Sequence, residues 1–300
     1  MPADTRLTFA STMMLLALAA VWGGSFFFAE IALREVPPMT ITLHRVLWAL
    51  PLLFILVKMS GIALPKEPRV WGAYLVMGAL NNAIPFTLIF WGQTQIDSGL
   101  ASILNGMTAM FGAVVAGFLL KDEPLTANKV FGAVLGLFGV AIIVGPDAIT
   151  NLSPTNLGQL AIILACLSYA FASVWGKTAL RHQPPMMNAL GMVAGSSLIM
   201  LPLVVWIDGV PSLSLSGSVI SALLGLAVLS TTLAYVLYFA ILKRAGAANL
   251  MLVTLLIPPF SIALGVLVLG EKLSSTAWFG FAFIALGLVV TDGRLLRRSV

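Results

Sequence analysis

The residues of this chain that could bind a small polar molecule lie in the middle of long apolar stretches. Amides and hydroxyls occur there in pairs, at Asn81-Asn82, Ser196-Ser197 and Thr231-Thr232. Such groups are unfavourable in lipid unless they are paired, so they should face the interior of a helix bundle. There they could contact a substrate or only hydrogen-bond a neighbouring helix, and both interpretations stay open. The candidate substrate-binding residues, including aromatic rings that could stack on a substrate, are Trp22, Asn81, Asn82, Asn105, Tyr169, Thr231, Thr232 and Tyr235.

Proline adds to this pattern in the third apolar stretch. Pro85 follows Asn81 and Asn82 by about one turn. Because proline has no N–H group, it leaves the carbonyl four residues earlier, at Asn81, without a helical donor. The position equivalent to Pro85 in the second half of the chain is Thr232, one turn before Tyr235. The sequence therefore predicts a pocket with polar groups from one half and aromatic walls from the other.

Arg45 is a cation inside the second apolar stretch, roughly 10 Å from its start. An arginine at the centre of a membrane helix costs about 2.5–3.5 kcal/mol to insert, and somewhat less near the interface. Arg45 could bind a substrate carboxylate, or it could pair with Glu30 or Glu35. We favour the pairing, with Arg45 and Glu30 as a charge pair at the gate.

The sequence offers no set of residues typical of an enzyme. It lacks a Cys/His metal cluster, a phosphate-binding loop and a Ser/His/Asp set. Its single cysteine, Cys166, excludes an internal disulfide. We expect no catalytic residue, no metal and no cofactor.

The elements that carry these residues are membrane helices. Sixty per cent of the residues are hydrophobic and 9% are charged, which is outside the range of soluble domains. Apolar stretches of about 20 residues, one bilayer long as helices, recur along the chain. We expect an all-α integral membrane protein with ten transmembrane helices, near 8–29, 38–57, 70–92, 98–120, 127–146, 156–177, 186–206, 217–241, 246–269 and 275–292.

The chain repeats itself. The stretch 33–39 returns as 180–186, an offset of 147 residues, and Glu123 is matched by Glu271 at an offset of 148. We therefore place a first five-helix repeat at 1–147 and a second at 148–300. The N-terminal stretch resembles a cleavable signal peptide, but its counterpart lies in mid-chain, so we expect it to be the first span.

Positive charge predicts the orientation. Thirteen of the sixteen Lys and Arg residues fall in the loops on one side and two on the other, which places both termini in the cytoplasm. Since each repeat has five helices, the two repeats must cross the membrane in opposite directions. The basic residues form no stripe along one face, so we expect no nucleic-acid partner.

These features resemble the drug/metabolite transporter superfamily, in particular its EamA-type ten-helix exporters. The resemblance rests on Trp22-Gly23-Gly24-Ser25-Phe26, His44-Arg45, Glu123-Pro124-Leu125 and Gly270-Glu271-Lys272-Leu273. The resemblance covers nearly the whole chain. Among the members of the superfamily, the chain is most similar to bacterial exporters of amino acids, including aromatic ones. One departure is at Met107-Thr108, where the family usually has a proline, and it leaves open whether the two halves bend alike.

The resemblance and the residues together imply a secondary transporter. We expect it to export amino acids and related small metabolites across a bacterial cytoplasmic (inner) membrane, by alternating access at a midplane cavity between the repeats. An exporter of other metabolites or drugs, or a lipid flippase, stays open as an alternative. The expected partners are the small-molecule substrate and membrane lipid. Glycine-rich faces on the fifth and tenth helices are compatible with a monomer or a homodimer.

Overall fold

The computed structural model describes residues 8–144, 153–212 and 214–292, and over these residues the chain is helical. Eight of the described helical stretches are long and apolar enough to cross a membrane, and two shorter apolar stretches, Val253–Leu269 and Ser275–Thr291, follow them. The predicted all-α membrane architecture is confirmed, and the ten described stretches follow the order of the predicted ten. Six spans are single helices: α1 (Phe9–Ala32), α2 (Pro38–Met59), α7 (Ala127–Val144), α8 (Pro154–Ala179), α9 (Pro185–Ile207) and α13 (Ser275–Asp292).

The other four spans are interrupted. The third consists of α3 (Pro68–Gly78), the π-helical segment η1 (Ala79–Ala83) and α4 (Ile84–Gln93). The fourth consists of α5 (Ser98–Asn105) and α6 (Met107–Leu119). The eighth consists of α10 (Gly217–Leu224), the π-helical η3 (Gly225–Leu233) and α11 (Ala234–Leu250), which is kinked at Gly246 (φ 78°, ψ 168°). The ninth consists of α12 (Val253–Leu264) and the π-helical η4 (Gly265–Leu269).

The interruptions follow the repeat. Adding the offset of 147 to η1, residues 79–83, gives 226–230, which lie inside η3. The fourth span breaks at Gly106, and the region that leads into α12 breaks in a turn at Met251-Leu252. Both halves are therefore interrupted at equivalent places, although of the fourth and ninth spans only the ninth carries prolines, Pro258 and Pro259.

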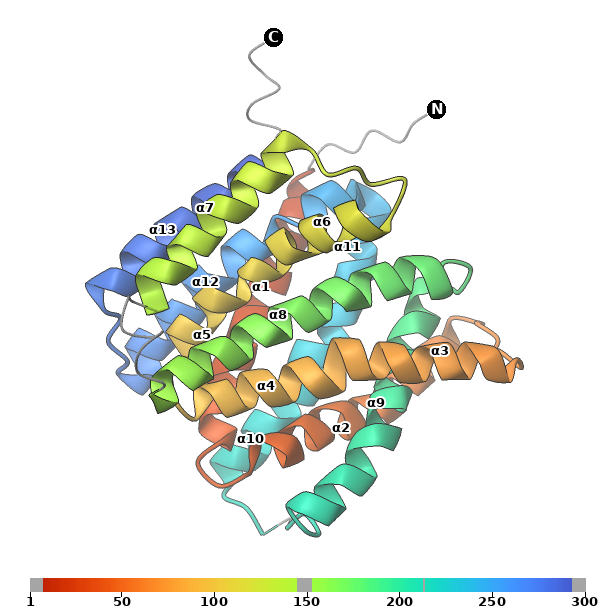
Figure 1. Ribbon diagram of the computed structural model, residues 1–300. Coiled ribbons are helices and arrows are strands. Elements are labelled where there is room, and N and C mark those ends of the chain that lie inside the picture. The colour runs from red at the N-terminus through yellow and green to blue at the C-terminus, as the bar shows by residue number, and fades with distance from the viewer. Residues whose placement is uncertain (1–7, 145–152, 213, 293–300) are drawn as a thin grey trace.

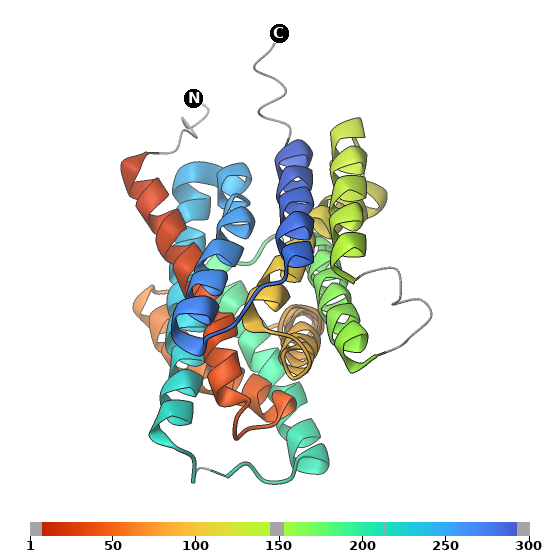
Figure 2. The same ribbon diagram turned by 90° about the vertical axis from the view of Figure 1, so that its left-hand side faces the viewer.

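Two faces can be defined from the ends of the helices. The start of α1 and the end of α13 lie at the same end of the bundle (Figure 2), which we call the terminal face. The loops 60–67, 120–126 and 180–184 also belong to it, because an even number of spans separates each from the start of α1. The loops 33–37, 94–97 and 270–274 belong to the opposite face.

The two repeats interlock rather than lie side by side as separate domains (Figure 1). Helix α1 packs on α12, and its inverted counterpart α8 packs on α6. In the same way α2 packs on η3 while α9 packs on α3, and α8 packs on α4 while α1 packs on α11. Helices α2 and α9, and α7 and α13, pair with their own counterparts. This interleaving brings residues from both repeats to the centre of the bundle.

Glycines allow one of these pairs to come very close. A Cβ atom on Gly139 of α7 would lie 2.6 Å from the Gly280 carbonyl oxygen of α13, and one on Gly280 would lie 2.7 Å from the Gly139 oxygen. Only residues without a side chain fit there, so these glycines form a contact within the chain.

Candidate functional site

The centre of the bundle is organised around Arg45, whose side chain runs from α2 into the interior. Its Nε donates a hydrogen bond to Thr231 Oγ1 (3.1 Å), and its Nη2 donates to the Ser230 carbonyl (3.2 Å), both in η3. Its guanidinium lies over the ring of Phe86, 3.8 Å from the centroid. The residue is only 6% exposed. Ser230 and Thr231 both lie inside the π-helical η3, a kind of segment that is frequent at functional sites.

The expected charge pair between Arg45 and Glu30 is absent, and that prediction was wrong. Neither Glu30 nor Glu35 lies within salt-bridge distance of Arg45 among the described residues. Gln93 Nε2 donates to Glu30 instead (3.4 Å), at the end of α4, and the Ser216 N–H donates to Glu35 (2.9 Å). Hydrogen bonds from Ser216 hold the pKa of Glu35 below its ordinary value.

Depth explains this difference. Arg45 lies seven residues into α2, from Pro38, about 10 Å along the helix, whereas Glu30 is close to the end of α1. The long arginine side chain reaches farther inward, where it interacts electrostatically with the hydroxyls of Tyr169 and Tyr235. In the described part of the chain the guanidinium therefore has hydroxyl, carbonyl and aromatic neighbours but no carboxylate partner.

A second set of contacts joins the third span to two helices of the other repeat. Asn82 is fully buried, and its Nδ2 donates to Ser196 Oγ in α9 (3.2 Å). Its Oδ1 accepts from the Tyr235 hydroxyl in α11 (3.4 Å) and from Asn81 Nδ2 (3.2 Å). Asn81 itself is only partly buried and also lies 3.5 Å from Met192 Sδ. The two adjacent amides thus differ, because Asn82 connects helices while Asn81 keeps exposed surface.

The carbonyl released near Pro85 belongs to Leu80, one residue before the predicted Asn81. In η1 the N–H of Ile84 bonds to the Ala79 carbonyl, five residues back. In the same register, residue 85 would donate a hydrogen bond to the Leu80 carbonyl, but Pro85 has no N–H group. Ser168 Oγ of α8 donates to the Leu80 carbonyl instead (2.7 Å). The π-helical register, which the sequence did not reveal, shifts the released carbonyl by one position.

The remaining candidates occupy the surroundings of this centre. The ring of Trp22 lies 6.0 Å from that of Tyr238, and Tyr235 stacks on Phe239. The Asn105 carbonyl accepts from Thr108, and its side chain lies 3.9 Å from Cys166 Sγ. Thr232 Oγ1 bonds to the Ala227 carbonyl of its own helix (3.0 Å). Arg45 is thus hydrogen-bonded to Thr231, and Asn81, Asn82 and Tyr235 form a second hydrogen-bonded group. Tyr169 interacts electrostatically with Arg45 and Tyr235. Trp22 connects to Tyr235 through the rings of Tyr238 and Phe239, whereas in the described part of the chain Asn105 and Thr232 have no hydrogen bond to either group.

A cavity of about 430 Å³ opens at the opposite face, away from the centre. It is lined by Glu30, Arg34, Asp97, Leu269, Gly270, Glu271 and Lys272. Burial raises the pKa of Asp97 above its ordinary value, and the negative charge of Glu271 raises it further. No group of three or more His, Cys, Asp or Glu side chains among the described residues could hold a metal ion.

Both halves of the chain are similar to one family of membrane proteins. The model of the EamA-like transporter family matches residues 10–145 and again residues 156–291, together most of the chain. The chain belongs to the EamA-like transporter family. It is therefore a transporter and an integral protein of the inner (cytoplasmic) membrane.

Relatives of this EamA-like transporter align with it from end to end. The "Uncharacterized transporter YoaV" of Bacillus subtilis (strain 168) is 25% identical over 289 residues, 95% of this chain and 98% of that protein. The "Probable amino-acid metabolite efflux pump" of Escherichia coli (strain K12) is 26% identical over 296 residues, 93% of each. One crystal structure matches 96% of this chain and 99% of its own with a TM-score of 0.69, and at 18% identity it shows a likeness of fold alone.

Of three further central residues of this EamA-like transporter, the sequence did not indicate Phe86 or Ser230, and it indicated Ser196 only as a polar residue in an apolar stretch. Phe86 lies under the guanidinium, Ser230 supplies the carbonyl, and Ser196 bonds to Asn82. Ser196 was among the polar pairs seen in the sequence, but Phe86 resembled any aromatic residue in an apolar helix. The stacked contact depends on the packing of the third span against α2, which spacing along the chain does not encode.

Proposed function

We propose that this EamA-like transporter exports amino acids and related small metabolites by alternating access, and that Arg45 binds the carboxylate of the substrate. The observation that supports this is a buried guanidinium, between the two repeats, with no acidic partner in the described part of the chain. A buried cation without a counter-charge is unfavourable, and a bound carboxylate would remove that penalty.

The guanidinium retains donors for such a ligand. Thr231 and Ser230 take hydrogen bonds from Nε and Nη2, and Nη1 has no hydrogen-bond partner among the described residues. Arginine pairs with a carboxylate through two parallel N–H donors. Nη1, together with the second N–H of Nη2, could therefore donate to the oxygens of one carboxylate. The stacking on Phe86 holds the guanidinium plane in place.

Neighbouring groups suit the rest of an amino acid. The Asn81 amide and the Tyr235 hydroxyl supply oxygen acceptors that an ammonium group needs. The rings of Tyr169, Tyr235 and Trp22 offer apolar walls for a side chain. The name of the relative from Escherichia coli, "Probable amino-acid metabolite efflux pump", agrees with this class of substrate.

Counterflow in proteoliposomes tests the proposal, first with a panel of the twenty amino acids and then with the decarboxylated amine of each amino acid that is transported. We expect exchange of the amino acids and not of the amines, and a roughly tenfold or greater loss in Arg45→Met, because a charge-assisted pair is broken. Arg45→Lys, which keeps the charge but not the planar fork, should retain part of the flux.

A binding measurement separates this role from a purely structural one. A transported amino acid at saturating concentration should raise the melting temperature of the wild type and not that of Arg45→Met. Equal transport of the amine, or wild-type flux in Arg45→Met, would contradict the carboxylate role. Transport of labelled lipid headgroups in the same vesicles, without amino-acid flux, would favour a flippase.

A further inference from the structure

A carboxylate from the second repeat holds the start of a helix in the first repeat. Glu271, in the loop after η4, accepts hydrogen bonds from the Ser98 N–H (Oε1, 3.0 Å) and from the Gly99 N–H (Oε2, 3.1 Å). These are the first two N–H groups of α5, which have no acceptor inside the helix. Asp97, the residue before them, makes no side-chain cap. The negative charge also lies at the positive end of the helix dipole, which stabilises the contact in addition to the two hydrogen bonds.

The surroundings of Glu271 are shaped for this contact. A Cβ atom on Gly265 would overlap Glu271 Oε2, and one on Gly99 would lie 2.8 Å from Leu273 Cδ1. Gly270 has φ +74°, in the left-handed region that favours glycine, and it turns the chain so that Glu271 folds back. The Glu271 N–H bonds to the Gly265 carbonyl (3.0 Å). We call this arrangement of Glu271 on Ser98 and Gly99 the opposite-face latch.

The repeat contains the parts of a second latch on the terminal face. At the offset of 148, Glu123 matches Glu271, Gly117 matches Gly265 and Leu125 matches Leu273. At the offset of 147, Ala245 and Gly246 match Ser98 and Gly99. By the inverted symmetry, the Glu123 carboxylate would reach the backbone of Ala245 and Gly246 from the other repeat.

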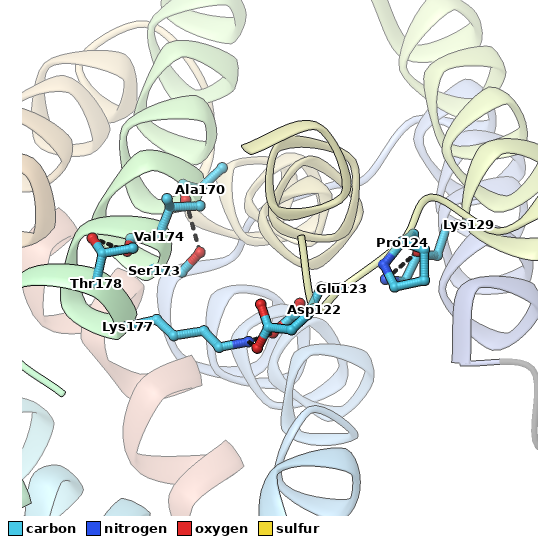
Figure 3. Close-up of polar contacts among 9 residues, drawn as sticks. All are labelled: Asp122, Glu123, Pro124, Lys129, Ala170, Ser173, Val174, Lys177 and Thr178. Atoms are coloured by element: carbon cyan, nitrogen blue, oxygen red, sulfur yellow. Dashed lines mark hydrogen bonds and ion pairs between the residues drawn. The ribbon is translucent and has the colours of Figure 1, made fainter. Parts of the chain in front are cut away.

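In this structure Glu123 is engaged elsewhere. Its Oε1 lies 2.6 Å from Lys177 Nζ of α8, and Asp122 Oδ2 lies 2.7 Å from the same nitrogen (Figure 3). The Glu123 side chain is 41% exposed. Leu125 lies on Gly117, where a Cβ atom would come within 2.9 Å of its Cδ1. Both carboxylates thus contact the other repeat, Glu271 through backbone N–H groups at the start of a helix and Glu123 through the side chain of a lysine.

We propose that Glu271 and Glu123 are positioning residues that close the two faces of the transporter in turn. In the described state the opposite-face latch is made and Glu123 is held by Lys177. When the opposite face opens, Glu271 leaves Ser98 and Gly99, and Glu123 moves from Lys177 to the backbone of Ala245 and Gly246. The inference rests on the proposed alternating access, but its test measures distances without any substrate and so is independent of the flux measurement.

Double electron–electron resonance between spin labels can test this in the full chain. Labels at Thr94 and Ser274 report the separation of the repeats at the opposite face, and labels at Thr126 and Lys243 report it at the terminal face; all four residues are exposed. Glu271→Gln should shift the population toward a longer Thr94–Ser274 distance and a shorter Thr126–Lys243 distance. The ratio of the two populations should change roughly tenfold. The carboxylate accepts two charge-assisted hydrogen bonds, whereas the amide is uncharged and has a single acceptor oxygen.

Two further variants test the direction of the shift in population. Glu123→Gln should shift both populations in the other direction, and because this side chain is half-exposed its loss will not prevent folding. Lys177→Met should release Glu123 and act in the same direction as Glu271→Gln. Glu67→Gln, at an exposed loop residue of the terminal face, is the matched control and should leave both distances unchanged. Distances that do not respond to Glu271→Gln and Glu123→Gln, or that respond in the same direction, overturn the inference.

Discussion

Asn82 and Tyr235 share a hydrogen bond, yet their surroundings give the two residues different roles. Asn82 is fully buried and bonds to Ser196, Tyr235 and Asn81, so it joins the third span to α9 and α11. Tyr235 is only partly buried, its bond to Asn82 is long at 3.4 Å, and it interacts electrostatically with Arg45. The amide is therefore chiefly a structural link, and the phenol is the better candidate for substrate contact.

We therefore expect Asn82→Ala and Tyr235→Phe to separate stability from transport. Asn82→Ala removes two interhelical hydrogen bonds, to Ser196 and Tyr235, and should lower the free energy of unfolding by about 1–2 kcal/mol. Tyr235→Phe keeps the ring and should leave the melting temperature near that of the wild type while flux falls several-fold. Melting in detergent and counterflow in proteoliposomes, measured on the same preparations, check both. A Tyr235→Phe variant with wild-type flux would move the substrate contact away from this hydroxyl.

At this scale the sequence predicted which residues lie at the centre better than it predicted their partners. Polar residues in apolar helices must face the interior, and that rule located Asn81, Asn82 and Thr231. It could not decide between Glu30 and Thr231 as the partner of Arg45. That choice depends on how far the side chain reaches and on the rotation of α2 against η3, and both are properties of the packed bundle.

At the scale of elements, helices α7 and α13 pack through glycines that follow the repeat. Gly139 and Gly280 place their backbones against each other, and so do Gly132 and Gly287. The sequence indicated small-residue faces on both helices but left open whether they pack within the chain or between two copies. In the structure the glycine faces of α7 and α13 pack against each other (Figure 1). These two faces are therefore buried within one chain and do not form a contact between two copies.

Substitution at this contact should act on stability through the helix pair. In Gly139→Ala the added Cβ would lie 2.6 Å from the Gly280 oxygen, and forcing the helices apart should cost about 1–3 kcal/mol. The matched control is Gly112→Ala in α6, where a Cβ would meet nothing within 4 Å. That variant should be neutral or more stable by up to about 1 kcal/mol, since alanine favours the helix. Equal melting temperatures for the two variants would argue against a tight α7–α13 contact.

The interruptions of the helices show where sequence patterns stop being informative. Apolar length and loop residues located the spans to within a few residues, because lipid imposes both. Proline marked the disturbance in the third span, but η3 of the eighth span has no proline and is nonetheless π-helical at the equivalent position. The break at Gly106 likewise occurs without the proline expected there. The two halves are interrupted alike because they occupy equivalent places in one packing scheme, not because they carry the same residues.

At the scale of the whole molecule, the repeat and its inversion follow from length, offset and parity alone. Five spans per repeat force the two repeats to cross the membrane in opposite directions, and the interleaved helix pairs agree with that arrangement. The latches of Glu271 and Glu123 could not be predicted in the same way. The match at an offset of 148 is visible in the sequence, but only the packed structure shows that the carboxylate of one copy reaches the helix start of the other repeat.

The charges of the loops predict which face lies in the cytoplasm. Lys58, Lys66, Arg69, Lys121 and Lys129 belong to the terminal face, against Arg34 and Lys272 at the opposite face. Because cytoplasmic loops are enriched in lysine and arginine, the terminal face should be cytoplasmic. Single cysteines at two exposed positions can test this: Thr126 on the terminal face, and Ser214 in the loop between α9 and α10 on the opposite face.

A membrane-impermeant maleimide added to intact cells should label Ser214→Cys, and it should label Thr126→Cys only after the membrane is permeabilised. The native Cys166 is buried, so the unsubstituted protein should stay unlabelled and serves as the control. The reverse pattern would place the terminal face outside. In that case the opposite-face latch would close the cytoplasmic side in the described state, and the proposed direction of export would have to be measured anew with right-side-out and inverted vesicles.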